Sequence, residues 1–199
     1  MPEAAPQFYP VPVGSVDHLG VGWWGLICAI ASEVALFGYL IFGYAYLGVQ
    51  LAPGDVHLSQ LSFRYSIPMT LIVIFSSIAI AWAEYGIKRG RRLPLIAGFS
   101  AALILAIGFI VLEYFEWTSE KFSPTSFALG SSFYVTTGVH LAHFVVGIVA
   151  LLIMIPLSAL GYFDGTRNAH VAITAGYWHF VNAMWVVLFI ALYVVPYIG

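Results

Sequence analysis

The stretch Ser131–Gly147, SSFYVTTGVHLAHFVVG, decides how the rest of this chain is interpreted. It lies inside Phe122–Phe163, the longest uncharged run of the sequence, and yet it contains two histidines. Helical spacing of i, i+4, i+7 and i+11 gives one stripe of polar and small side chains: Thr136, His140, His143 and Gly147. Because hydrocarbon offers imidazole and hydroxyl groups no partners, this stripe must face protein. The stretch is therefore predicted to be a central helix of a membrane bundle.

The composition is that of a membrane protein. Of the 199 residues, 61% are hydrophobic and only 8% are charged, and the mean hydropathy is +0.94. A soluble domain has about 25% charged residues. The formal net charge is −2, and no basic aromatic face for nucleic acid is present. The single cysteine, Cys28, cannot build a disulfide framework or a cysteine-based metal site.

The predicted fold is an all-α bundle of five transmembrane helices. A spanning helix needs roughly 20 apolar residues, and charges and prolines divide residues 19–199 into five such pieces. The predicted spans are residues 19–48, 68–87, 94–116, 126–158 and 171–196. Pro68 is expected in the first turn of the second span, and Ser123 is expected to cap a helix that continues through Pro124. Residues 1–18, which contain four prolines, are predicted to be an extended arm.

The basic residues predict the orientation of the bundle. Four of them crowd the second loop: Lys88, Arg89, Arg91 and Arg92. Positively charged loops stay in the cytoplasm. Five spans then place the N-terminus inside and the C-terminus outside.

Glu33 is the most informative single residue. It lies in the middle of the first span, where a charged carboxylate costs on the order of 3 kcal/mol on insertion scales. The side chain must therefore be neutral or paired with a donor. It is either a proton-relay acid or a neutral carboxyl in an interhelical hydrogen bond, for which His140 is a candidate acceptor. Glu113, Glu116 and Glu120 share one helical face, which is typical of a solvated helix end.

Three histidines raise the question of a metal or haem site. His140, His143 and His179 lie in apolar segments, and imidazole is the commonest metal ligand. A haem iron between two helices would use His179 with one of the other two. A metal site wants three or four convergent ligands, and the fifth span offers only Asn182 beside His179. Trp178 and Trp185, seven residues apart, form one bulky face of that span, either as core or as interfacial anchors. Packing with satisfied polar groups is favoured over metal binding.

Five motifs in order resemble subunit III of the haem–copper respiratory oxidases. They are Ser32–Glu33, the run Ile67–Thr70 with Ser76–Ser77, Glu116 ahead of Gly130–Ser131, TGVHLAH over Thr137–His143, and YWHFV over Tyr177–Val181. Asn182 stands where the family usually has aspartate. The chain lacks the first two helices of the seven-helix form and so is similar to the short, five-helix bacterial form.

The resemblance implies a non-catalytic accessory subunit of a proton-pumping terminal oxidase in a bacterial inner membrane. Such a subunit binds no haem or copper itself, holds phospholipid in a cleft, and packs against the catalytic subunit I and subunit II. It supports stability and sustained proton uptake of the complex. The residues expected to be buried, to line the lipid cleft or to hold the structure are Ser32, Glu33, Glu116, His140, His143, Trp178, His179 and Asn182.

Other interpretations remain open at this point. A related accessory subunit of a quinol oxidase or of a nitric oxide reductase shares this bundle. A small membrane haem protein using His140 or His143 with His179 is a different class. No phosphate loop, nucleophile triad or set of broken transporter helices is evident in the sequence.

Overall fold

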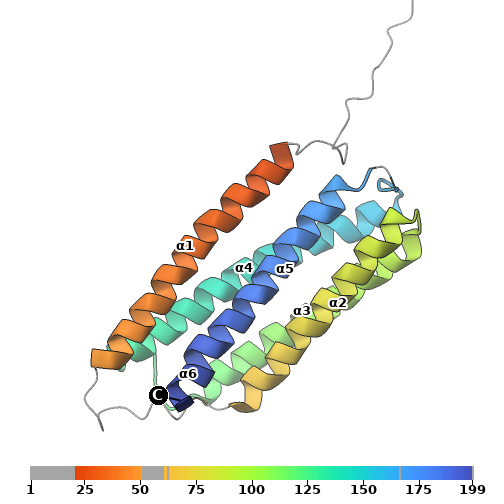
Figure 1. Ribbon diagram of the computed structural model, residues 1–199. Helices are drawn as coiled ribbons and strands as arrows, with labels where there is room; N and C mark the ends of the chain where they lie inside the picture. The colour runs from red at the N-terminus through yellow and green to blue at the C-terminus, as the bar shows by residue number, and fades with distance from the viewer. Residues whose placement is uncertain (1–20, 51–60, 62, 166, 199) are drawn as a thin grey trace, which may run out of the picture.

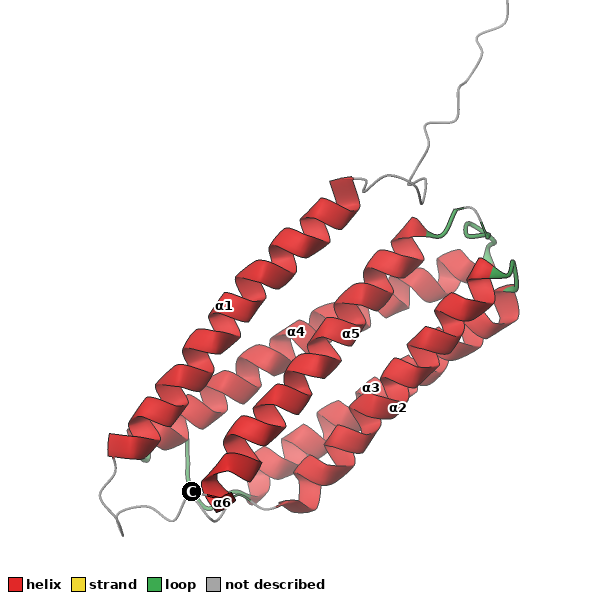
Figure 2. Ribbon diagram, viewed as in Figure 1, coloured by secondary structure: helices red, strands yellow, loops and turns green. Residues whose placement is uncertain are grey.

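The computed structural model describes residues 21–50, 61, 63–165 and 167–198, so the predicted N-terminal arm lies outside the described residues. Within these ranges every regular element is a helix, as Figure 2 shows. The elements are α1 (Val21–Gln50), α2 (Phe63–Lys88), α3 (Arg92–Ser119), α4 (Ala128–Ala159), α5 (Ala169–Phe189), the π-helix η2 (Ile190–Val194) and α6 (Val195–Ile198). Five helices, with η2 continuing the last, are long and apolar enough to cross a membrane. The predicted all-α bundle of five spans is confirmed.

The helices run roughly side by side, with α1 at one edge of the bundle (Figure 1). α2 and α3 form the most closely packed pair. α4 packs against α3, α5 packs against α2, and α1 packs mainly against α4 and α5. α5 therefore has neighbours on both sides. The fold places α4 and α5, which carry the histidines, between the edge helix and the tight pair.

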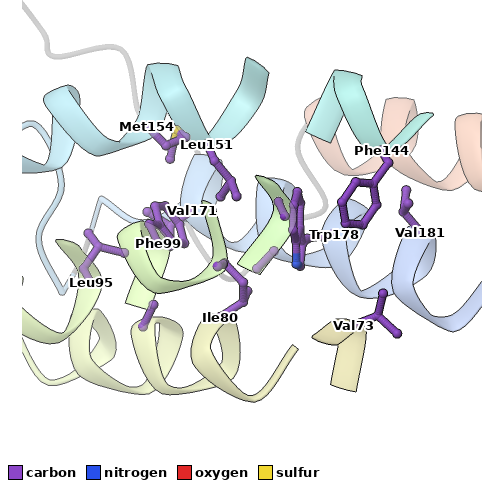
Figure 3. Close-up of a cluster of buried hydrophobic side chains, with 14 of the residues drawn as sticks. Val73, Ile80, Leu95, Phe99, Phe144, Leu151, Met154, Val171, Trp178 and Val181 are labelled. Atoms are coloured by element: carbon purple, nitrogen blue, oxygen red, sulfur yellow. The ribbon is translucent and has the colours of Figure 1, made fainter. Parts of the chain in front are cut away.

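The core lies where α2, α3, α4 and α5 meet. Figure 3 shows Trp178 of α5 inside this cluster, beside Phe144 of α4. Their ring centroids are 5.2 Å apart. Many large apolar side chains on the outer faces are exposed, including Phe42, Ile104 and Leu152. In a membrane these faces meet lipid, so packing contacts rather than water exclusion hold the bundle together.

Two glycines end helices at the same end of the bundle. Gly90 has a φ of +72° and Gly161 a φ of +83°, a conformation that side chains with a Cβ rarely adopt. After α2, the Arg91 N–H donates to the carbonyl of Gly86 at 3.0 Å, and after α4 the Tyr162 N–H donates to Leu157 at 3.1 Å. These six-to-one bonds satisfy carbonyls that a helix end leaves without donors.

Two expectations about helix starts were wrong. α2 begins at Phe63, so Pro68 lies inside the helix and not in its first turn. In that position the proline removes one backbone hydrogen bond, which neighbouring helices compensate in membrane proteins. α4 begins at Ala128 with Phe127 as its N-cap residue. The hydroxyl of Ser126 accepts from the Ser123 N–H at 2.9 Å, so Ser123 closes a turn before the helix instead of capping it.

The orientation stays a prediction, with a direct test. The loop after α2 and the loop after α4, with Arg167, lie at one end of the bundle (Figure 1). If this basic end faces the cytoplasm, an alkaline phosphatase fused after Gly199 is expected to be active in the periplasm. A green fluorescent protein fused there should stay dark. The reverse pattern would show that the basic end faces outward.

Candidate functional site: polar contacts between the helices

Glu33 of α1 pairs with a histidine of α4. Its Oε2 lies 2.7 Å from Nε2 of His143, and the two side chains are 22% and 19% exposed. The candidate partner named from the sequence, His140, is not the one that Glu33 meets. His143 lies less than one turn further along α4 and at its α1-facing edge, where its ring packs against Phe37, with 5.5 Å between ring centroids. The identity of the partner depends on the rotation of α4, which spacing alone does not determine.

The second ring nitrogen of His143 restricts its protonation. Nδ1 is 2.7 Å from the carbonyl oxygen of Val139. A carbonyl only accepts, so the network assigns the proton to Nδ1. Nε2 is then the ring nitrogen that faces Oε2 of Glu33.

His140 is buried in an aromatic cage. Its Nε2 is 3.2 Å from the carbonyl of Val181 on α5, which makes Nε2 the donor. The rings of Phe109 and Trp185 lie 5.8 Å and 5.3 Å away by centroid. Nδ1 has no hydrogen-bond partner in the described part of the chain. His140 thus ties α4 to α5.

Ser76 of α2 is the centre of a second polar contact. Its Oγ accepts from Nε1 of Trp178 and from Nδ2 of Asn182, both at 3.0 Å. It also donates to the carbonyl of Val73 at 3.3 Å. One donor and two acceptor positions exhaust the hydrogen-bonding capacity of a hydroxyl. This buried serine therefore joins α2 to α5.

Two further bonds extend this α2–α5 contact. Asn182 Nδ2 also donates to Oγ of Ser77 at 2.9 Å. Six residues before Ser76 on α2, Oγ1 of Thr70 accepts from Nε1 of Trp185 at 3.1 Å. Trp178 and Trp185 are both buried, so they are core residues and not interfacial anchors. The serine pair and the residues after YWHFV, which lie more than 100 residues apart in sequence, belong to one network.

His179 faces a different neighbour from the other two histidines. Its Nε2 is 3.9 Å from Oε2 of Glu84 on α2. It lines a shallow groove of about 270 Å³ between α2 and α5, together with Val73, Ser77 and Asn182. The structure therefore does not bring His179 together with His140 or His143. In residues 21–50, 61, 63–165 and 167–198, no three His, Cys, Asp or Glu side chains converge as a metal site requires.

Ser32 of α1 and the glutamates of α3 have different environments. Ser32 is exposed, and its Oγ donates to the Ala29 carbonyl of its own helix at 2.7 Å. Glu113 and Glu116 are 1% and 0% exposed, so the prediction of a solvated face was wrong for both. They continue the buried stripe of Ala102, Ala106 and Phe109 at helical spacing. The helical spacing of these positions indicated burial already in the sequence, but the charge of the glutamates led to the opposite interpretation.

Glu120, just beyond α3, is the member of that face nearest to solvent. Burial raises the pKa of its carboxyl above the ordinary value, and the neighbouring charge of Lys121 acts in the opposite direction. Nearby, the indole Nε1 of Trp117 donates to Thr137 at 3.2 Å, and the Tyr134 hydroxyl donates to the carbonyl of Phe122 at 2.9 Å. These bonds fix the end of α3 against the start of α4.

Fold and polar contacts define a class of protein. The chain is a multi-pass membrane bundle in which interior polar groups such as Ser76, Trp178 and Asn182 bind one another across helices. Its residues 18–197 match the sequence profile of a family described as cytochrome c oxidase subunit III. Because the match covers most of the chain, the protein belongs to the cytochrome c oxidase subunit III family.

Individual relatives agree with the family profile. A cytochrome c oxidase subunit 3 of Osphranter robustus is 29% identical over 183 residues, which cover 85% of this chain and 68% of the relative. The same subunit of Drosophila yakuba is 28% identical over 180 residues, with the same coverage. That of Scyliorhinus canicula is 27% identical over 179 residues, again covering 85% and 68%.

The histidine contacts lead to a prediction about metal content. Replacing His140 or His143 by glutamine is expected to leave the haem and metal content of the purified complex unchanged. Each ring makes a polar contact to a carbonyl or carboxyl that a glutamine amide can partly replace. Haem spectra and elemental analysis, normalised to protein, check this. Loss of one metal or one haem per complex in either variant contradicts it.

Proposed function

We propose that this chain is the non-catalytic accessory subunit III of a proton-translocating oxidase that reduces oxygen in aerobic respiration. The observation that supports this most strongly is the family membership over nearly the whole chain. Relatives carry the name cytochrome c oxidase subunit 3. The oxygen chemistry belongs to the complex, and its haems and copper to partner subunits I and II.

The internal contacts support a structural and supporting role for the chain itself. Ser76 uses its full hydrogen-bonding capacity between α2 and α5, and His143 is engaged by both Glu33 and Val139. Catalytic groups have to present free donors, acceptors or ligands to a substrate. These side chains are occupied in joining helices.

Phospholipid binding is the second part of the proposal. A pocket of about 430 Å³ at the basic end is lined by apolar side chains, among them Ile153, Met154 and Leu157, and by Tyr162, Arg167 and His170. Such a pocket suits an acyl chain below and a phosphate at the rim. Two guanidinium nitrogens of Arg167, Nε and Nη2, also donate hydrogen bonds to Oδ2 of Asp164, at 3.0 and 2.8 Å. A bound phosphate would therefore share this guanidinium with Asp164.

We place the complex in a bacterial plasma membrane, on the basis of the resemblance to the short five-helix form. The decisive experiment is affinity purification of the native complex through a tag on this chain, followed by haem and metal analysis. The proposal expects a partner with two haems and copper, and oxygen consumption by the preparation. A partner with haem and non-haem iron but no copper would indicate a nitric oxide reductase. A haem absorption band from the isolated chain would indicate a haem protein.

Glu33 provides a functional prediction within this proposal. Glu33→Gln keeps the size of the side chain and a donor for His143, so assembly and the initial rate of oxygen reduction are expected to stay within about twofold of wild type, because the change removes an accessory contact and no reacting group. The lifetime of activity over many turnovers should be shorter. An oxygen electrode records both in one trace. Immediate loss of turnover in a fully assembled variant would instead place Glu33 in the main proton path.

Chemical labelling with a carbodiimide gives a second measurement on Glu33. Carbodiimides attack a protonated carboxyl, and the 22% exposed Glu33 is accessible, whereas Glu113 and Glu116 are closed off. Labelling of the wild-type chain is therefore expected on Glu33 in preference to Glu113, Glu116 and Glu120, with Glu33→Gln as its control.

A further inference from the structure

The groove between α2 and α5 has polar side chains on the outside of the bundle. It measures about 270 Å³, and Ser77, His179 and Asn182 line it among apolar neighbours. The side chain of His179 is 36% exposed, and its Nε2 lies 3.9 Å from Oε2 of Glu84, which is too far for a hydrogen bond. Polar groups within a membrane span face protein or a cavity, because hydrocarbon offers them no partners. The groove is therefore expected to be covered by protein.

The hydroxyl of Ser77 has a proton that it does not donate. Its Oγ accepts from Nδ2 of Asn182 at 2.9 Å, but within the described ranges its own O–H has no acceptor. The neighbouring Ser76, in contrast, donates to the carbonyl of Val73. Oδ1 of Asn182, in the same groove, also lacks a hydrogen-bond partner among the described residues. A hydroxyl can donate one hydrogen bond as well as accept, so the donor of Ser77 is available to a group outside the chain.

Ser77 lies too deep in the membrane for a lipid head group. Eleven residues separate it from Lys88, the end of α2, which corresponds to about 17 Å of helix. The hydrocarbon core is about 30 Å thick, so with the charged Lys88 at its surface the hydroxyl is near the middle. Acyl chains have no acceptor at this depth. A helix of a second protein supplies one through a side-chain oxygen.

The walls of the groove suit a helix as the occupant. On α2, Ile74 and Ile78 are 44% and 57% exposed, and on α5 the groove includes the exposed Ala183. A small residue lets a second helix approach closely, and the branched side chains beside it provide the packing that drives association in lipid. The outer face of α3 provides a reference surface, with Ile104 and Ile107 exposed.

We propose that this groove binds a transmembrane helix of another subunit of the oxidase. That helix packs on Ile78 and Ala183 and places a side-chain oxygen where the Ser77 hydroxyl donates to it. The accepting group is a hydroxyl, a carboxamide or a carboxyl, since these side chains have oxygen acceptors. Covering the groove also removes the ring of His179 from lipid. The inference rests on the proposed function, because it takes the partner to be a member of the same complex.

Photo-crosslinking in the purified oxidase complex tests the contact. A benzophenone amino acid is placed at Ile78, in the groove, or at Ile107, on the outer face of α3, as the control. Illumination is expected to join position 78 to a membrane-spanning peptide of another subunit, which mass spectrometry identifies. Position 107 is expected to give lipid adducts. Adducts of position 78 with lipid only, or with a second copy of this chain, overturn the proposal.

A matched pair of substitutions tests the same groove without a probe. Ala183→Leu fills the groove, and Ala101→Leu adds the same atoms to the exposed face of α3. The complex is purified through a tag on the catalytic subunit, and the amount of this chain in it is normalised to the amount in membranes. Ala183→Leu is expected to lower this ratio several-fold, and Ala101→Leu to leave it at the wild-type value. Equal ratios in the two variants contradict the site. The proposed function is judged separately, from the haem and copper of the wild-type complex.

Discussion

Trp178→Ala is expected to cost about 3 kcal/mol of stability, the lower end of the range for truncating a buried tryptophan. The side chain is buried where α2, α4 and α5 meet, and its N–H is the partner of Ser76. Because the unfolded chain stays in lipid, the loss comes from the cavity and the unpaired hydroxyl and not from exposure to water. Thermal unfolding of the detergent-solubilised complex should show an earlier loss of this subunit.

A double substitution separates this packing from general damage. A Cβ on Gly147 would lie 2.9 Å from two ring carbons of Trp178, so Gly147→Ala alone is expected to destabilise by about 1 kcal/mol or more through overpacking. In the Trp178→Ala background the same methyl group keeps an ordinary contact of 3.7 Å with Cε1 of Tyr177 and no longer clashes. The two changes together should therefore destabilise less than their sum. Trp82→Ala, on an exposed face, is the control and should have little effect. Additive costs would contradict the contact.

Gly98→Ala is expected to separate α2 from α3. The new Cβ would lie 2.5 Å from the backbone oxygen of Ala79 and 2.8 Å from Cβ of Ala83. A backbone atom cannot rotate away as a side chain does, so the helices must move apart. The expected cost is at least about 2 kcal/mol, within the range for overpacking, and the amount of subunit in membranes should fall several-fold.

Gly108→Ala provides the matched control for Gly98. It lies ten residues further along α3, and its Cβ would meet only the flexible end of Ile72, at 3.7 Å, an ordinary contact. Immunoblots of membranes and melting curves should leave this variant close to wild type. Equal losses in both variants would mean that alanine itself, and not the α2–α3 distance, causes the effect.

The helical stripe in α4 shows how much of the burial pattern can be predicted from helical periodicity. Thr136, His140 and Gly147 are buried and His143 is half-buried, as the spacing predicts. The same 3.6-residue rule, extended from Phe109, would have placed Glu113 and Glu116 inside. Their charge suggested solvent instead. Periodicity was the better guide because every helix of a membrane bundle has a protein-facing side.

By itself the sequence determined that five apolar helices cross a membrane, because length and hydropathy depend only on the order of residues along each span. Its ordered motifs also pointed to the family. The tertiary structure alone decided which groups meet: Glu33 with His143 instead of His140, and Ser76 with Trp178 and Asn182. Such pairings depend on the rotation and depth of one helix against another. Close backbone approach at residues such as Gly98 sets both, and no single helix encodes them.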